Sequence, residues 1–125
     1  MPEKITCTHT VQVGSTLQRA VSTVIEVAAY DVLEVTIADG ATDEEVELQP
    51  GSDVQLLMIT ADSYDPSLSY KVNAAANPSH DLDQPQIFFG SGAVSLLDAS
   101  APASLFVSNA TGQNVVLSVV VGRNV

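Results

Sequence analysis

Residues 4 to 13 alternate between two kinds of side chain with a period of two. One face carries Ile5, Cys7, His9, Val11 and Val13, and the other carries Thr6, Thr8, Thr10 and Gln12. Strict alternation of this length is typical of a β-strand. Gly14-Ser15 then predicts a turn that ends the strand.

Residues 20 to 30 are open to two interpretations. Val21, Val24, Ile25 and Ala28 fit the spacing of a short helix, whereas the β-branched content and the flanking residues favour a strand. We expect a strand here and keep a helix as the alternative.

The rest of the chain predicts further short strands separated by turns. They cover residues 32–38, 46–48, 54–60, 68–73, 86–89, 93–97, 104–108 and 115–121. The strand at 54–60 is expected to be buried on both faces, and residues 74–85 form the longest irregular stretch. Because helices and strands do not alternate, the pattern predicts an all-β fold. We expect an antiparallel two-sheet sandwich, jelly-roll-like, with under ~15 % helix.

The chain has 125 residues, which is enough for one domain with a core of its own. We predict an N-terminal strand and possible arm at residues 1–13. Residues 14–125 are then a single β-sandwich domain.

The formal net charge is −11, with bases only at Lys4, Arg19, Lys71 and Arg123. Binding to nucleic acid or to an anionic membrane requires clustered bases, so neither is expected. Charged residues make up only 15 % of the chain. This low fraction indicates that part of the surface contacts other protein.

Neither a membrane span nor a secretion signal is visible in the sequence. No segment reaches the ~18 consecutive apolar residues of a spanning helix, and the N-terminus lacks the apolar core of a signal peptide. The only cysteine, Cys7, cannot form an internal disulfide. Synthesis in a reducing cytoplasm fits these features.

Two acidic segments raise the question of a metal site. His80 with Asp81 and Asp83 offers one imidazole and two carboxylates for zinc or another divalent ion, and Asp39 to Glu47 is rich in carboxylates. The second segment does not match a calcium-binding loop. We expect a solvated loop at the first and a solvated acidic hairpin at the second, and therefore no metal or other cofactor.

Candidate nucleophiles are equally weak. Cys7 and His9 share a face, but their Cβ atoms are expected about 6.5–7 Å apart on one strand. His9 itself is expected to be a core or interface residue. Ser91 lacks the Gly-x-Ser-x-Gly elbow of a hydrolase, and the sequon at Asn109 reads as a turn. No catalytic residue is predicted, so we expect a protein that is not an enzyme.

Two segments, Phe89 to Leu97 and Ser104 to Arg123, carry a family resemblance. Over residues 53–123 the chain resembles the small, acidic, Val- and Ser-rich capsid decoration (cement) proteins of tailed bacteriophages. The resemblance implies that Ser104 to Arg123 forms a β-hairpin that closes the fold. The resemblance implies a virion structural protein on the capsid surface, often a homotrimer, that binds the major capsid protein and bridges its subunits.

The N-terminal strand is the predicted anchor for such a partner. Its polar face carries the candidate partner-binding residues Lys4, Thr6, Thr8, Thr10 and Gln12. A terminal strand of this kind can add to an open sheet edge of a neighbour. An ordinary edge strand of the chain's own sandwich is the alternative.

Two other functions remain open at this point. One is a carbohydrate- or host-binding module, which Tyr30, Tyr64 and Tyr70 would favour if they were exposed together. The other is a component of a phage tail or baseplate.

Overall fold

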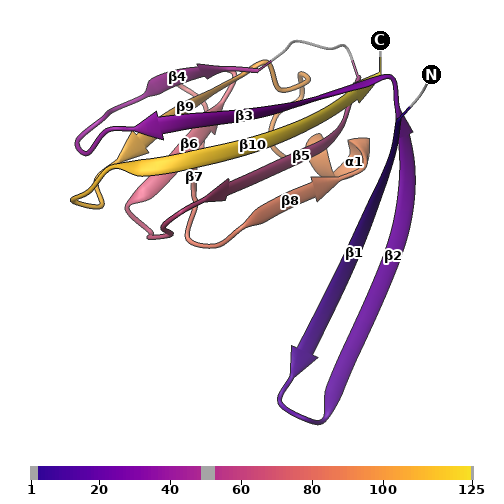
Figure 1. Ribbon diagram of the computed structural model, residues 1–125. Coiled ribbons are helices and arrows are strands. Elements are labelled where there is room, and N and C mark those ends of the chain that lie inside the picture. Colours follow the sequence, from indigo (N-terminus) through magenta and orange to yellow (C-terminus); the bar gives the residue numbers. More distant parts are fainter. Residues whose placement is uncertain (1–2, 49–52, 125) are drawn as a thin grey trace.

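The computed structural model describes residues 3–48 and 53–124 of the chain. These residues form ten strands and one four-residue helix (Figure 1). The strands are β1 (Glu3–Val13), β2 (Leu17–Val27), β3 (Ala29–Ile37), β4 (Glu44–Glu47), β5 (Asp53–Ala61), β6 (Leu68–Val72), β7 (Ser79–Asp81), β8 (Gln86–Phe89), β9 (Ser104–Asn109) and β10 (Val115–Asn124). Every strand pairing is antiparallel, which confirms the all-β antiparallel class.

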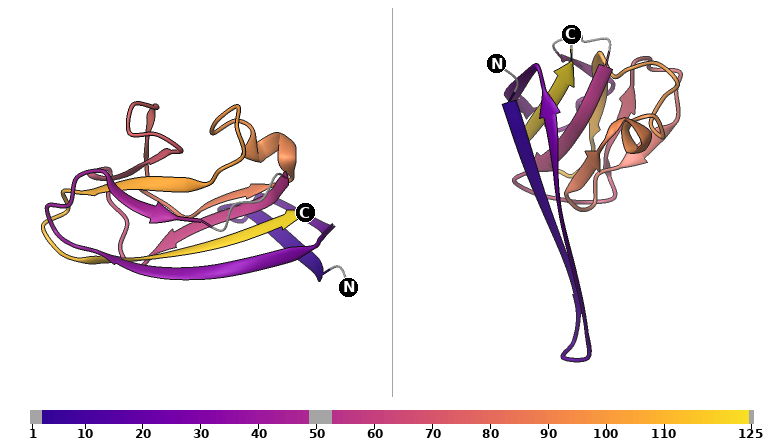
Figure 2. Two further views of the ribbon diagram at one scale, coloured as in Figure 1. Left: turned by 90° about the horizontal axis from the view of Figure 1, so that it is seen from above. Right: turned by 90° about the vertical axis from the view of Figure 1, so that its right-hand side faces the viewer.

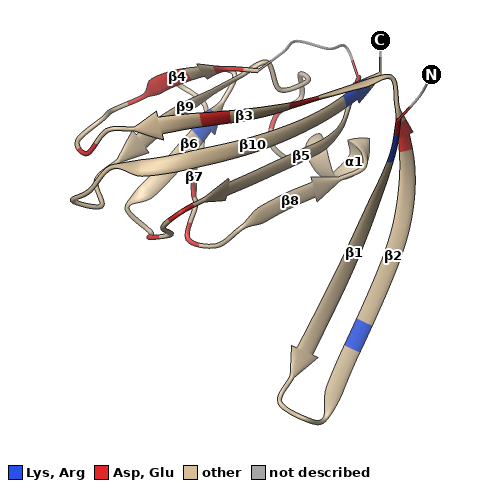
Figure 3. Cartoon of the chain, viewed as in Figure 1, with Lys and Arg blue, Asp and Glu red and all other residues tan. Residues whose placement is uncertain are grey.

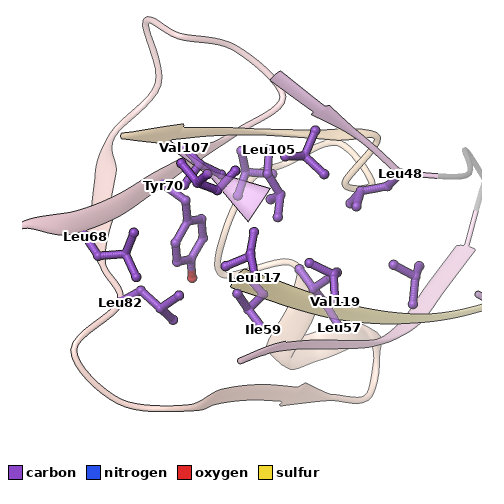
Figure 4. Packing of buried hydrophobic residues seen from close by; sticks show 14 of the residues in the cluster. Leu48, Leu57, Ile59, Leu68, Tyr70, Leu82, Leu105, Val107, Leu117 and Val119 are labelled. Carbon is purple, nitrogen blue, oxygen red and sulfur yellow. The ribbon is translucent and has the colours of Figure 1, made fainter. Parts of the chain in front are cut away.

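Eight of the strands form two four-stranded sheets that face each other. One sheet has the order β3-β10-β5-β8 and the other the order β4-β9-β6-β7 (Figure 2). Alternate residues of β10, among them Leu117 and Val119, point into the space between the sheets and are buried. They meet Leu105 and Val107 of β9 from the opposite sheet (Figure 4). The hydrophobic core therefore lies between these two sheets.

Consecutive strands usually lie in opposite sheets, and this corrects two expectations. The acidic segment after Ile37 is not a hairpin, because β3 and β4 belong to different sheets. Nor do β9 and β10 pair as a closing hairpin, since β9 pairs with β4 and β6 while β10 pairs with β3 and β5. Both segments instead connect one sheet to the other.

The first two strands form a separate two-stranded sheet, here called the arm (residues 3–27). Its strands pair residue for residue from Glu3 with Val27 to Val13 with Leu17, without a bulge. The helix considered for residues 20–30 is therefore wrong. Figures 1 and 2 show the arm leaving one corner of the sandwich and extending well beyond it.

Two local expectations also differ from the structure. Residues 93–97, expected as a strand, belong to the short helix α1 (Ser91–Val94) and the turn after it. Gly90 enters this helix with φ 95°, and the turn buries Val94 against the core. Within the stretch expected to be irregular, Ser79–Asp81 forms β7 and pairs with β6.

The structure extends the N-terminal element beyond the range expected for it. A single strand over residues 1–13 was expected to precede the sandwich, whereas Leu17–Val27 also lies in the arm and pairs with β1. The eight sandwich strands begin at Ala29. The residue between arm and sandwich, Ala28, is therefore the structural junction.

Candidate interaction surface

The arm is fixed to the sandwich at its base. The Ala28 N–H is shared by two acceptors, the Arg123 carbonyl oxygen at 3.0 Å and Asn124 Oδ1 at 3.1 Å. Beside this junction, Arg123 forms an ion pair with Asp31 of β3. These contacts tie the end of β2 to the last strand of the sandwich and fix the direction in which the arm leaves.

The arm's apolar face packs across the outer face of the β3-β10-β5-β8 sheet. A Cβ atom on Gly122 of β10 would lie 2.9 Å from Ile5 Cδ1 and 3.4 Å from Val27 Cγ1, so the glycine permits this close approach. Further along β1, the His9 ring meets the Phe89 ring of β8 edge to face, with centroids 6.4 Å apart. The arm thus crosses the sheet from β10 to its β8 edge.

Beyond Phe89 the same apolar face has no cover among the described residues. Val11 and Val13 are 58 % and 55 % exposed, and Val21 opposite His9 is 56 % exposed. These side chains therefore lie outside the core between the two four-stranded sheets. We call residues 9–21 the arm tip, and its uncovered side chains form an apolar surface on a projecting hairpin.

The opposite face of the arm is polar and open to solvent. It carries all five residues predicted to bind a partner, and each of them is exposed: Lys4, Thr6, Thr8, Thr10 and Gln12. Thr8 Oγ1 lies 3.3 Å from Ser22 Oγ across the hairpin, so hydroxyl groups line both strands. The structure brings the predicted residues together on one accessible strip, and their binding role stays a prediction.

Charge divides the molecule into two parts. The arm contains two acids and two bases, so the formal charge of −11 belongs to the rest of the chain. From Ile5 to Ile25 the only Lys, Arg, Asp or Glu is Arg19, and Figure 3 shows this stretch almost free of coloured positions. A neutral hairpin therefore projects from a strongly acidic sandwich.

A groove runs along the arm where it crosses the sheet. It encloses about 350 Å³ and is lined by residues of β1 together with Tyr30, Leu56 and Val120. Next to it, four outward-facing side chains form one cross-strand row: Val32, Val120, Met58 and Ile87. We call this the outer apolar row. Val32 is 62 % exposed and Ile87 42 %, so this row is an apolar part of the outer sheet face that the arm leaves largely uncovered.

Cys7 and His9 come closer together than their Cβ separation suggested. Cys7 Sγ lies 2.9 Å from His9 Nε2, because both side chains bend toward each other on the face turned to the sheet. Within the part of the chain that the structure describes, no group of three His, Cys, Asp or Glu is placed to hold a metal ion.

A second hollow lies over the β6-β7 edge, between Tyr70, His80 and Phe88. The His80 ring is tilted over the Tyr70 ring at 5.4 Å, and Tyr70 donates a hydrogen bond of 2.5 Å to Gln86 Oε1. Asp81 and Asp83, considered with His80 as metal ligands, are exposed. Tyr70 is thus held by a hydrogen bond and a ring contact, whereas His80 Nε2 is buried without a hydrogen-bond partner among the described residues.

Tyr70 predicts a fall in stability at alkaline pH. Its burial raises the pKa of the phenol well above the ordinary value of 10. Because the folded-state pKa exceeds the unfolded one, the stabilisation is complete below about pH 10 and is lost as the pH rises toward the folded-state value. We expect the free energy of unfolding to fall more steeply above about pH 10 in the wild type than in Tyr70→Phe, measured by urea denaturation. Equal slopes would contradict the prediction.

The acidic segment 39–47 is largely solvated. Glu44, Glu45 and Glu47 are exposed, as expected for side chains without buried counter-charges. Asp43 is the exception, since its carboxylate lies 3.1 Å from Lys71 Nζ and accepts from Ser108 Oγ. This ion pair fixes the crossing segment onto the β4-β9-β6-β7 sheet.

The three tyrosines do not form one surface. Tyr30 is exposed on the outer sheet face, whereas Tyr70 is 2 % exposed in the core. Tyr64 is half-buried, and its hydroxyl accepts a hydrogen bond from the Ala61 N–H. The exposed aromatic group that would have favoured a carbohydrate-binding module is therefore not present in the described structure.

The arm, the groove and the outer apolar row are thus the features that stand out for function. Among the described residues, none of the helical segments is both long and apolar enough for a membrane span. Comparison of the chain with protein-family models, with curated proteins and with solved structures finds no significant match.

Proposed function

We propose that this chain is a non-enzymatic virion structural protein that decorates the capsid shell of a tailed phage and stabilises it by bridging capsid subunits. The observation that carries the proposal is the arm, an eleven-residue-per-strand hairpin that projects from a folded sandwich with its polar face fully open. A rigid sandwich with a projecting arm suits a protein that holds two neighbours at once. The arm binds the major capsid protein, and copies of the chain associate as a homotrimer on the capsid surface.

The sandwich architecture supports the same proposal. We infer a jelly roll, because eight strands are divided equally between two sheets. In addition, the first and the last strand of the sandwich, β3 and β10, pair with each other. Jelly rolls recur in viral capsid and lectin domains. Since the tyrosines are dispersed, the capsid role is favoured over the lectin-like one.

The proposed contact with the capsid protein is the polar strip of Lys4, Thr6, Thr8, Thr10 and Gln12. Hydroxyl and amide groups form hydrogen bonds with an open sheet edge, and the unpaired edges of β1 and β2 offer backbone groups as well. No residue of the strip other than Lys4 is charged, so little desolvation of charge opposes binding.

Shells of the encoding virus assembled without this chain test the proposal. The wild type is expected to co-sediment with them and to raise the temperature at which they disrupt. Thr8→Glu combined with Thr10→Glu is expected to weaken binding at least about 30-fold, because unpaired charges would be buried. Thr42→Glu combined with Ala75→Glu, which adds the same two charges on exposed sandwich loops, is the matched control and is expected to bind normally.

Electron microscopy of particles reports the location directly. Density for the chain on the icosahedral surface supports the proposal. Density along the tail axis would overturn it in favour of a tail or baseplate component. An absence of shell binding by the folded wild type would overturn both the capsid role and the proposed partner.

A further inference from the structure

We propose that the apolar face of one copy's arm tip binds the outer apolar row of a second copy of this chain. This inference concerns the face opposite the polar strip and does not depend on a capsid. The contact would cover two exposed surfaces with each other, the arm tip of one copy and, in the second copy, the row Val32, Val120, Met58 and Ile87.

The chain already shows this kind of contact within one copy. The arm base lies on the neighbouring cross-strand row of the same sheet face, where Ile5 meets Gly122 and Leu56 is only 6 % exposed. The outer apolar row is the next row on that face, two residues further along each strand. A second arm would therefore continue an interface that exists, on a surface of the same chemistry.

The dimensions of the two surfaces match. Three strands span about 10 Å at a spacing of about 4.8 Å, and four steps along a strand cover about 13 Å. In the arm base, the four steps from Ile5 to His9 reach from Gly122 on β10 to Phe89 on β8, across three strands. In the arm tip, the same number of steps joins His9 to Val13. The tip can thus cross three residues of the outer row, Val120, Met58 and Ile87, as the base crosses the first row.

Charge favours a second copy as the occupant. Arg19 lies opposite Val11, so it belongs to the apolar face of the tip, and the described residues provide it with no ion pair. Glu34 lies on the outer sheet face two residues after Val32, and it is exposed. An arm seated on the outer row with β2 toward the neighbouring row of Glu34, Ser118 and Thr60 would bring Arg19 to the side of the row on which Glu34 of the second copy lies.

The charge distribution also explains why the arm is the contact. The sandwiches carry the whole net charge and repel each other, whereas the arm is neutral and can approach an acidic neighbour. The contact is heterologous, arm to sheet, so repeating it around a symmetry axis closes a ring in which every arm and every row is used.

Sedimentation equilibrium of the full chain without shells tests the proposal. The wild type is expected to self-associate, and Val21→Asp or Val32→Asp is expected to raise the dissociation constant about 30-fold or more. Val24→Asp is the matched control, because Val24 is equally exposed on the same strand but lies on the polar face. Circular dichroism confirms that each variant keeps its β structure.

A charge exchange tests the register of the contact. Arg19→Glu and Glu34→Arg are each expected to weaken association, and the double variant is expected to restore it. A wild type that remains monomeric, a Val24→Asp variant as weak as Val21→Asp, or a double variant no better than either single one would overturn the proposal. If Val21→Asp associates normally but no longer binds shells, the shell protein covers the apolar face instead and the proposal is also overturned.

Discussion

Removing residues 1–27 is expected to leave a folded sandwich that neither self-associates nor binds shells. The eight remaining strands keep all their pairing partners, because β1 and β2 pair only with each other among the described strands. The truncated chain loses the cover over Leu56 and Phe89, which costs about 2 kcal/mol of folding free energy. Urea denaturation measures this cost, and light scattering and co-sedimentation measure association.

A shortened arm separates the role of the arm base, which covers the sheet, from the role of the arm tip, which is proposed to bind partners. Replacing residues 9–21 by Asn-Gly joins Thr8 to Ser22, which lie directly opposite each other, through a two-residue turn. This variant keeps Ile5 over Gly122 but loses the ring contact of His9 with Phe89, so its stability is expected to lie between that of the wild type and that of the truncated chain, whereas association and shell binding are lost. Loss of folding in the deletion, or normal shell binding by either variant, would contradict the prediction. Removing only residues 1–10 is a poorer test, because β2 would lose its partner.

Asn109→Ala is expected to cost about 3 kcal/mol of folding free energy, the largest effect of a single polar substitution that we predict. Asn109 is 1 % exposed. Its Nδ2 donates to the carbonyl oxygens of Ile37 at 3.0 Å and Gln113 at 2.8 Å, and its Oδ1 accepts from the Thr111 N–H and hydroxyl. Alanine would leave these groups without partners in a buried site.

Asn114→Ala is the matched control. Asn114 lies in the same connection but is exposed, and its Oδ1 accepts one hydrogen bond from the Asp39 N–H at 3.0 Å. Its removal is expected to cost less than about 1 kcal/mol, since water replaces the lost partner. Urea denaturation of both variants compares the two costs. Equal losses would show that the buried network around Asn109 does not hold the two crossing segments together.

The alternation of apolar and polar side chains predicted most strands, because it depends only on residues that are neighbours in the sequence. It could not predict which strands share a sheet, since Val11 and Val13 of the arm occupy the same pattern as Val119 and Val121 of the core. The difference lies in what covers them, and that depends on strands far along the chain. For the same reason the sequence predicts hairpins after Ile37 and Asn109, where the structure has connections between the two sheets.

Local failures have local causes. At residues 20–30 the helical spacing of Val21, Val24 and Ile25 was real, but pairing with β1 decides the conformation. At residues 93–97, Gly90 in the left-handed region starts a helical turn that alternation does not reveal. The three-residue β7 is too short to carry any periodicity.

The candidate site was predicted in part. The five polar residues of β1 follow directly from the alternation, and the structure finds them all exposed. The outer apolar row was missed as a surface, although the two-faced apolar pattern of residues 54–60 was its signal. That pattern was interpreted as burial on both faces, whereas on the outer face Met58 is only half-buried.

The central position of β10 has a consequence for the synthesis of the protein. Among the described strands, β10 is the only sheet neighbour of β3 and one of the two neighbours of β5, and it follows both of them far along the chain. During synthesis β3 therefore stays unpaired until β10 has emerged, while the arm, with its local pairing, is complete much earlier. The sheet therefore closes late and slowly, as expected for distant strand pairings. During that interval an unpaired Val-rich strand is exposed to aggregation, and the acidic charge of the chain is its protection.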